Sequence, residues 1–232
     1  MDEVLRKIHA VAEVHTDKHF VYTGETHGAS YYKYSRLLSP EHLPLLREAS
    51  LHLFAGIIER TGLNAESPLI IAGAETLGAE MVRQIFYAPA SEDYPFLAHR
   101  SGWHRCIFNK KQGTREFTLA DLPEGDFLPG DAPIVWFDDS LNAASTLKRT
   151  RSLIETPERR IIALGVLCDR SGLSVETLQV RHVEALEIQP LERYDPEECP
   201  YCTKRRPIVL SLGYGKQFKR DHPDYPGGFV WI

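Results

Sequence analysis

Two adjacent aspartates, Asp138 and Asp139, stand between a hydrophobic run and a stretch of small residues. Residues 142–146 have the sequence NAAST, and the pattern that follows them is helical. A small-residue loop that opens a helix leaves backbone N–H groups free at the positive end of the helix dipole, where a phosphate can bind. The carboxylates can hold ribose hydroxyls or a hydrated Mg²⁺ that is itself bound to phosphates. The segment therefore predicts a sugar-phosphate site, although two acids before a helix also occur as simple N-terminal caps.

A second turn of small residues follows the apolar run at residues 68–72. Gly73 and Gly78 flank Glu75 and Thr76 in this turn. Its backbone N–H groups could hold a pyrophosphate. A tight strand-to-helix turn that needs small residues for packing explains the same pattern equally well.

Basic residues occur at two further places. Arg100, Lys110 and Lys111 lie in a charged stretch that could close over pyrophosphate and exclude water. A solvated charged loop is the plainer interpretation of this stretch. Upstream, Tyr31 and Lys33 offer an aromatic ring and a charge that would suit an acceptor base and a phosphate, but a simple edge hairpin explains them equally well.

The cysteines are too few and too scattered for a disulfide framework. Cys199 and Cys202 form a CxxC pair, whereas a structural zinc site needs four ligands. No second CxxC or His pair lies nearby in the sequence, so Cys106 or His222 could complete a site only through the fold. We therefore favour a structural turn or an incomplete metal site over zinc at Cys199 and Cys202.

Apolar periodicity and turn residues predict the elements that position these groups. Helices are expected at residues 1–13, 39–62, 78–87 and 142–155, and strands at residues 19–24, 68–72, 103–108, 132–137 and 160–167. Ser39 is expected as the N-cap of the second helix, with Pro40 as its first residue and Gly62 as its stop. The alternation predicts an α/β fold with a mostly parallel sheet and helices on both faces. Ligands bind at the carboxyl ends of such strands, which is where Asp138 falls.

The composition is that of an ordinary globular chain, with 232 residues, 43% of them hydrophobic and 25% charged. No apolar run is long enough to cross a bilayer. The acidic N-terminus lacks the basic residues of a signal peptide, so we expect a cytoplasmic protein without a membrane partner. The net charge of −5 argues against a general nucleic-acid binder. The last 45 or so residues are rich in Pro, Tyr and charge, and predict an irregular appendage.

Residues 133–146 resemble the phosphoribosyl pyrophosphate (PRPP) motif of type I phosphoribosyltransferases. Asp138, Asp139 and Thr146 match that motif, while residues 142–145 stand where the family has Thr-Thr-Gly-Gly/Ser. The turn after residue 72 resembles the pyrophosphate loop of the orotate branch, with a leucine in place of one glycine.

Two further segments complete the resemblance. Residues 19–38, with Lys33, resemble the N-terminal hood of the orotate-like enzymes, and residues 100–117 fall where the family has a mobile basic loop. All four segments occur in the family's order between about Phe20 and Arg170, an order that is much harder to obtain by chance than any single motif.

The resemblance implies a type I phosphoribosyltransferase fold, with its hood, over residues 1–185, and a C-terminal appendage at residues 186–232 on the same domain. It implies a homodimer that uses Mg²⁺ to transfer the phosphoribosyl group of PRPP to a nitrogen of a small base, with release of pyrophosphate. The implied roles are catalysis by Asp138, Asp139, Lys110 and Lys111, with the two aspartates also near Mg²⁺, directly or indirectly; 5′-phosphate binding by Asn142, Ala143, Ala144, Ser145 and Thr146; pyrophosphate binding by Ala74, Glu75, Thr76, Leu77, Gly78 and Arg100; and base or hood contacts by Tyr31 and Lys33.

Other functions stay open at this stage. The departures at residues 142–145 favour a protein that binds a nucleotide as a sensor or regulator without turning over PRPP. A variant is an effector in a toxin or phage-defence cassette, with protein partners encoded in the same operon. The least favoured function is a zinc-assisted nucleic-acid module that uses Cys199, Cys202 and the basic residues 204–206.

Overall fold

The computed structural model describes residues 2–22, 25–112, 114, 116–120 and 128–232. The chain divides into two compact units. The sheet unit comprises Met1–Ala10 and Ser35–Gln189, and the hood–tail unit comprises Val11–Tyr34 and Pro190–Ile232. Residues 19–34 of the predicted hood are thus grouped with the C-terminal segment, whereas residues 35–38 stay with the sheet unit.

A six-stranded sheet forms the centre of the sheet unit, in the order β10-β9-β8-β5-β6-β7. The strands are β5 (Leu69–Ala74), β6 (Trp103–Lys110), β7 (Phe117–Leu119), β8 (Ile134–Leu141), β9 (Ile161–Asp169) and β10 (His182–Ile188). All neighbours are parallel except β6 and β7, which form an antiparallel hairpin at one edge. The expected mostly parallel α/β fold is confirmed, and β7 and β10 extend it beyond the predicted strands.

The strands are apolar because both faces of the sheet are covered. Every residue of β5 is buried, as is all of β9 except its last residue, Asp169. A continuous apolar run, rather than an alternating one, is typical of parallel strands between two helical layers.

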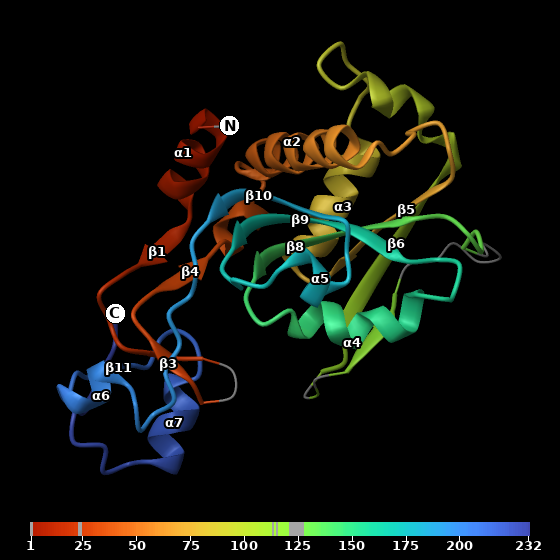
Figure 1. Cartoon of the computed structure of the whole chain (residues 1–232). Helices are drawn as coiled ribbons and strands as arrows, with labels where there is room; N and C mark the ends of the chain where they lie inside the picture. Colours follow the sequence, from red (N-terminus) through yellow and green to blue (C-terminus); the bar gives the residue numbers. More distant parts are fainter. Residues whose placement is uncertain (1, 23–24, 113, 115, 121–127) are drawn as a thin grey trace. The chain divides into compact units, whose positions relative to one another are not determined.

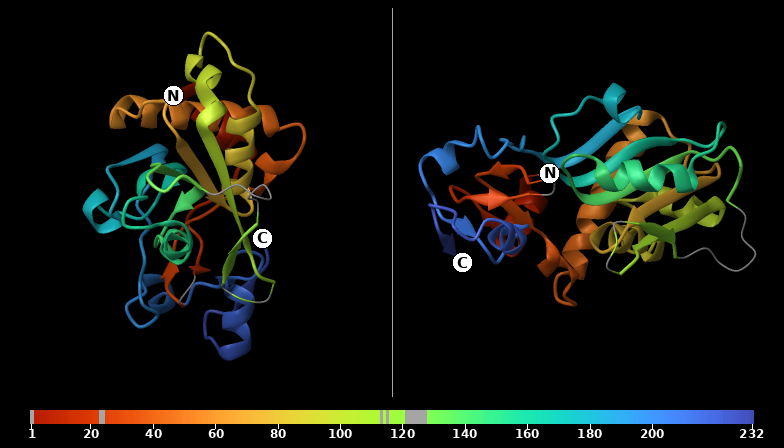
Figure 2. Two further views of the ribbon diagram at one scale, coloured as in Figure 1. Left: turned by 90° about the vertical axis from the view of Figure 1, so that its right-hand side faces the viewer. Right: turned by 90° about the horizontal axis from the view of Figure 1, so that it is seen from below.

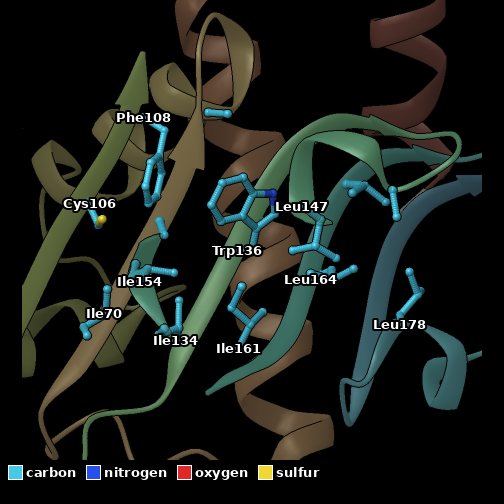
Figure 3. Close-up of a cluster of buried hydrophobic side chains, with 14 of the residues drawn as sticks. Ile70, Cys106, Phe108, Ile134, Trp136, Leu147, Ile154, Ile161, Leu164 and Leu178 are labelled. Carbon is cyan, nitrogen blue, oxygen red and sulfur yellow. The ribbon is translucent and has the colours of Figure 1, made fainter. Parts of the chain in front are cut away.

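Helices cover the two faces of this sheet (Figure 1). They are α1 (Asp2–Val11), α2 (Leu43–Thr61), α3 (Leu77–Tyr87), α4 (Ser145–Ile154) and α5 (Val175–Leu178), with two 3₁₀ turns, η1 (Ser35–Leu38) and η2 (Pro95–Gly102). The helices α2 and α3 lie on one face, and α4 and α5 lie on the other (Figures 1 and 2). On the α4 face, Trp136 packs in a buried cluster that includes Phe108, Leu147 and Leu164 (Figure 3).

The start of α2 differs from the expected one. Its N-cap is His42, and Ser39 instead forms a preceding turn, where its carbonyl accepts hydrogen bonds from the N–H groups of His42 and Leu43. The physical reason is a second proline: Pro44 would interrupt a helix that began at residue 40, but it is tolerated in the first turn of a helix that begins at Leu43. The predicted end is confirmed, because Gly62 adopts the left-handed conformation with φ 66°.

The hood–tail unit is built from short elements of both chain segments. It contains β1 (Glu13–His15), β2 (Phe20–Val21), β3 (His27–Gly28), β4 (Tyr31–Lys33), α6 (Pro200–Thr203), β11 (Ile208–Val209), α7 (Gly215–Asp221) and β12 (Phe229–Val230). Phe20 and Tyr22 share one small buried cluster with Val209 and Leu212. The C-terminal segment, expected to be irregular, therefore contributes half of a small core.

Among the described residues, every helix is too short or too polar to span a membrane.

Candidate functional site

The carboxyl end of β8 carries the two predicted acids on opposite sides of the strand. Ile134 and Trp136 point into the cluster on the α4 face, and Asp138 continues this side of the strand into a pocket beside α4. On the other side, Phe137 packs with its ring 6.2 Å from that of Phe54 in α2. Alternation along the strand explains why Asp138, and not Asp139, lines the pocket.

The pocket has a volume of about 70 Å³ and lies where β8 meets α4. It is lined by Trp136, Asp138, Leu164, Val166 and residues 140–147. The structure thus brings Asp138 together with all five residues predicted to bind a 5′-phosphate. Whether they bind one stays a prediction.

The start of α4 offers backbone donors to this pocket. The first N–H groups of a helix have no acceptor within the helix, and no side chain caps α4. Its N-cap, Ala144, is buried and adopts the left-handed conformation with φ 53°. Glycine takes this conformation freely, whereas an alanine pays about 1 kcal/mol or more for it. Ala144 stands at one of the positions where the resembling motif has glycine.

The two carboxylates accept only local hydrogen bonds. Asp138 Oδ1 accepts from the N–H of Asp139 at 2.9 Å, and Asp139 Oδ1 accepts from the N–H of Ser140 at 2.7 Å. Burial raises the pKa of both carboxyl groups, and the negative charge of Asp139 raises the pKa of Asp138 further. Among the described residues, no Lys, Arg or His side chain forms an ion pair with either acid. The pair would therefore gain from a cation or from hydroxyl donors.

The turn between β5 and α3 packs directly against the end of β8. A Cβ atom at Gly78 would lie 2.5 Å from the carbonyl oxygen of Phe137 and 3.2 Å from the Cα of Asp138. A Cβ atom at Gly73 would in turn collide with the carbonyl oxygen of Gly78. Close packing of the backbone therefore explains why glycine is required at both positions. The same packing brings the predicted pyrophosphate turn beside Asp138 and Asp139.

Within this turn, Glu75 and Thr76 are exposed and joined by a cis peptide bond, while Ala74, Leu77 and Gly78 are buried. The Glu75 carboxylate accepts a hydrogen bond from the backbone N–H of Lys110 at 2.6 Å. This contact places the end of β6 next to the turn.

Of the predicted basic residues, the structure places Lys110 and Lys111 near the β5–α3 turn and Arg100 away from it. Lys110 ends β6 at the same edge of the sheet as the turn, and its side chain is exposed. Lys111 forms an ion pair with Glu116 at 2.9 Å across the β6–β7 hairpin. Arg115 of the predicted basic loop at residues 100–117, and Thr23 and Gly24 of the predicted hood at residues 19–38, lie outside the described residues.

Arg100 is not brought to this edge. It lies just before β6, whose first residue pairs with the first residue of β5, so it is at the opposite end of the sheet. Its guanidinium donates hydrogen bonds to the carbonyl oxygens of Phe86, at 3.1 Å, and of Ala88. Arg100 thus satisfies carbonyl groups at the end of α3, which accounts for its charge without a pyrophosphate.

Tyr31 and Lys33 belong to the hood–tail unit. Lys33 pairs with Glu13 at 3.1 Å across strands β1 and β4, and the Tyr31 ring lies 5.6 Å from that of Phe20. These contacts lie within the unit itself, and a role toward a base stays a prediction.

Sequence reasoning missed a second group of residues. We expected a structural turn or an incomplete metal site at Cys199 and Cys202, and the structure adds two potential ligands to the two cysteines, His19 and His27. Cys106, the suggested further ligand, instead belongs to the buried core of the sheet unit. The available signal was the pair of histidines in the short hairpin of residues 19–28, but nothing in the local sequence links it to a CxxC so far along the chain.

No family model matches the chain. A curated orotate phosphoribosyltransferase from Chlorobium phaeobacteroides is 27% identical over 195 residues, which are 82% of this chain and 84% of that protein. The crystal structure of orotate phosphoribosyltransferase from Francisella tularensis aligns with a TM-score of 0.50 at 14% identity, over 81% of this chain and 84% of that one. The chain is therefore similar in sequence to an orotate phosphoribosyltransferase and has the type I phosphoribosyltransferase fold.

Proposed function

We propose that this protein transfers the phosphoribosyl group of PRPP to a nitrogen of a small base and releases pyrophosphate. The observation that carries the proposal is the pocket at the start of α4, where Asp138 and free helix N–H groups meet beside the β5–α3 turn. A sugar with a phosphate on one side and a pyrophosphate on the other needs acids for its hydroxyls and donors on both sides. The similarity to an orotate phosphoribosyltransferase supports the same reaction class.

Each part of the site has a distinct task in this reaction. The N–H groups at the start of α4, with the hydroxyls of Ser145 and Thr146, hold the 5′-phosphate. Asp138 and Asp139 hold the ribose hydroxyls and so fix the anomeric carbon in the position for attack. The turn around Glu75 and Thr76 holds the pyrophosphate. No side chain needs to act as a nucleophile, because the resemblance implies an oxocarbenium-like transition state whose main demand is positioning and charge neutralisation.

A magnesium ion fits the acids at this site. Asp138 and Asp139 are half-buried, their pKa values are raised, and no described basic side chain pairs with them. Carboxylates combined with substrate phosphates are the usual ligands of Mg²⁺ in such sites. When bound, the ion would supply positive charge to the departing pyrophosphate. Lys110, exposed beside the turn, would add a second positive charge there.

Isothermal titration of PRPP, with and without Mg²⁺, tests the proposal. Asp138→Asn/Asp139→Asn should weaken Mg²⁺-dependent binding by about 100-fold, or about 2.8 kcal/mol. Asp131→Asn, an exposed acid before β8, is the matched control and should bind as the wild type does. Pyrophosphate release in the presence of a panel of bases then identifies the acceptor. Wild-type protein that binds no PRPP would refute the proposal.

A nucleotide-binding protein without turnover is the second candidate, and one observation favours it. Ala144 occupies a left-handed position with its methyl group buried, where a glycine would let a phosphate approach more closely. Binding of a nucleoside monophosphate without PRPP binding would select this function. The resemblance also implies a homodimer, and analytical ultracentrifugation would test that part of the proposal.

A further inference from the structure

Four potential metal ligands converge inside the hood–tail unit. The ligand atoms of His19, His27, Cys199 and Cys202 all lie within 4.8 Å of one another. His19 Nε2 is 2.9 Å from His27 Nδ1, 3.6 Å from Cys199 Sγ and 3.7 Å from Cys202 Sγ, and His27 Nδ1 is 3.1 Å from Cys202 Sγ. Three of the four residues are buried. The cluster joins residues about 180 positions apart in the sequence.

Hydrogen bonding alone does not account for this arrangement. His19 Nδ1 lies 3.0 Å from the carbonyl oxygen of Arg206, which can only accept, so this nitrogen carries the proton. His19 Nε2 then has one lone pair, and one imidazole and two thiols crowd around it. Either tautomer of His27 leaves a conflict: a proton on Nδ1 competes with the thiols for the His19 lone pair, whereas a proton on Nε2 is buried without an acceptor among the described residues and leaves two lone pairs facing each other at 2.9 Å. A cation placed between the four atoms would use a lone pair from each.

The spacing is close to that of a tetrahedral zinc site. Zinc binds histidine nitrogen at about 2.0–2.1 Å and cysteine sulfur at about 2.3 Å, so tetrahedral ligands lie roughly 3.3–3.8 Å apart. The two separations between His19 and the cysteine sulfurs fall in this range, and the two made by His27 Nδ1 are a few tenths of an ångström shorter. The remaining two separations, from Cys199 Sγ to His27 Nδ1 and to Cys202 Sγ, are no more than 4.8 Å, so adjustments of the side chains would bring the four atoms to tetrahedral spacing.

We propose that His19, His27, Cys199 and Cys202 bind one structural Zn²⁺ ion. Two imidazoles and two thiolates form a closed set with no position for substrate, which is characteristic of structural rather than catalytic zinc. The two thiols lose their protons on binding, so their negative charges balance the ion. The bond from His19 Nδ1 to the Arg206 carbonyl fixes the ring so that Nε2 faces the ion, as outer partners of zinc ligands commonly do.

The position of the cluster explains what the ion does. The hood–tail unit has about 70 residues from two segments, and its described residues form small buried clusters around Phe20 and Val21. The apolar core of a unit of this size supplies only a few kcal/mol, and a structural metal ion is one of the ways in which small units gain further stability. A zinc ion would join residues 19–27 of the first segment to the CxxC of the second. This inference is independent of the proposed transferase reaction.

Metal analysis of the purified protein by mass spectrometry tests the site. The wild type should contain one zinc per chain, and Cys199→Ser/Cys202→Ser should contain less than about a tenth of that. The matched control is Cys106→Ala in the sheet unit, which should keep its full zinc content. Cys106 is a poor rival ligand, since burial raises the pKa of its thiol to about 12.

Cobalt substitution of the wild-type protein keeps the proposal testable even if the double variant fails to fold. Zinc is removed with a chelator and Co²⁺ is added alone; a thiolate-to-cobalt charge-transfer band and intense visible bands of tetrahedral cobalt are expected at one equivalent. His19→Ala should weaken these bands. Wild-type protein with free thiols and no bound metal, a Cys199–Cys202 disulfide detected by intact mass, or full zinc content in the double variant would each overturn the assignment.

Discussion

Replacement of Gly78 by alanine should disturb both stability and ligand binding, because this glycine holds the β5–α3 turn against β8. The added methyl carbon would lie 2.5 Å from the Phe137 carbonyl oxygen and 3.2 Å from the Asp138 Cα. Both neighbours are backbone atoms, so neither can rotate away, and β8 is fixed between β5 and β9. Overpacking of this kind costs about 1–3 kcal/mol, and we expect Gly78→Ala to fall near the upper end.

A second glycine provides the matched control. A Cβ atom at Gly102 would meet its nearest neighbour, a backbone atom of Pro68, at 3.7 Å, which is ordinary contact. Gly102→Ala should therefore leave stability unchanged or raise it by about 0.4–1 kcal/mol through the entropy of the unfolded chain. The two substitutions add the same methyl group, so the difference between their free energies of unfolding isolates the contact with β8.

Urea unfolding followed by tryptophan fluorescence measures the difference, because Trp103 and Trp136 are both buried in the sheet unit. The affinity for PRPP, measured by calorimetry, should fall together with stability in Gly78→Ala, since the methyl group separates the turn from Asp138. Equal stability of the two variants would refute the packing argument. A destabilised Gly78→Ala that bound PRPP with wild-type affinity would refute the placement of pyrophosphate at this turn.

Three further substitutions test other parts of the site. Asp138→Asn should stabilise the ligand-free protein by roughly 0.5–2 kcal/mol at pH 7. Burial and the charge of Asp139 raise the pKa of Asp138 in the folded protein above its value in the unfolded chain. The stability of the wild type therefore falls as the pH rises through the folded-state pKa. In urea titrations the gain should shrink as the pH is lowered toward about 4, and a pH-independent gain would contradict the cause given. Arg100→Ala should destabilise the fold by about 1.5–3 kcal/mol, because two carbonyl groups at the end of α3 lose their hydrogen-bond donor. The affinity for PRPP, measured by calorimetry, should not change. Loss of affinity without loss of stability would support the pyrophosphate-binding role of Arg100. Lys110→Ala should lower the affinity for PRPP by about tenfold, or about 1.4 kcal/mol. Lys111→Ala should lower it by clearly less, because Lys111 already pairs with Glu116. The reverse order would assign the charge that neutralises the pyrophosphate to Lys111.

Much of the sheet could be predicted from sequence because its signals are local. The strands β5 and β9 are apolar along almost their whole length, and Gly62 marks the end of α2. The start of α2 was harder to locate, since two prolines compete for the first turn and only Pro44 has the correct position in the observed helix. The strand β10 was missed because its partly exposed residues break the apolar run.

The cluster of His19, His27, Cys199 and Cys202 could not be predicted, for a different reason. His19 and Cys199 meet only because the segments Val11–Tyr34 and Pro190–Ile232 fold together, with β2 and β11 in one unit. Such pairing over about 180 residues leaves no periodic trace in the sequence. The CxxC indicates two of the four potential ligands, and the other two are a pair of histidines with no metal-binding spacing of their own.

A glycine in a loop can be required either by backbone packing or by the close approach of a ligand, and the two predicted binding loops differ in this respect. Gly73 and Gly78 lie where backbone packs against backbone, so the fold requires them whether or not a pyrophosphate binds. Ala144 stands in the predicted phosphate loop at φ 53°, where the fold accommodates a buried methyl group at a backbone cost of about 1 kcal/mol, and where close approach of a ligand would favour glycine further. Glycine matches are therefore weak evidence for catalysis in this chain. The stronger evidence is that Asp138 and Asp139 have no ion-pair partner among the described residues, since two acids with raised pKa values lower stability until a cation or hydroxyl donors bind to them.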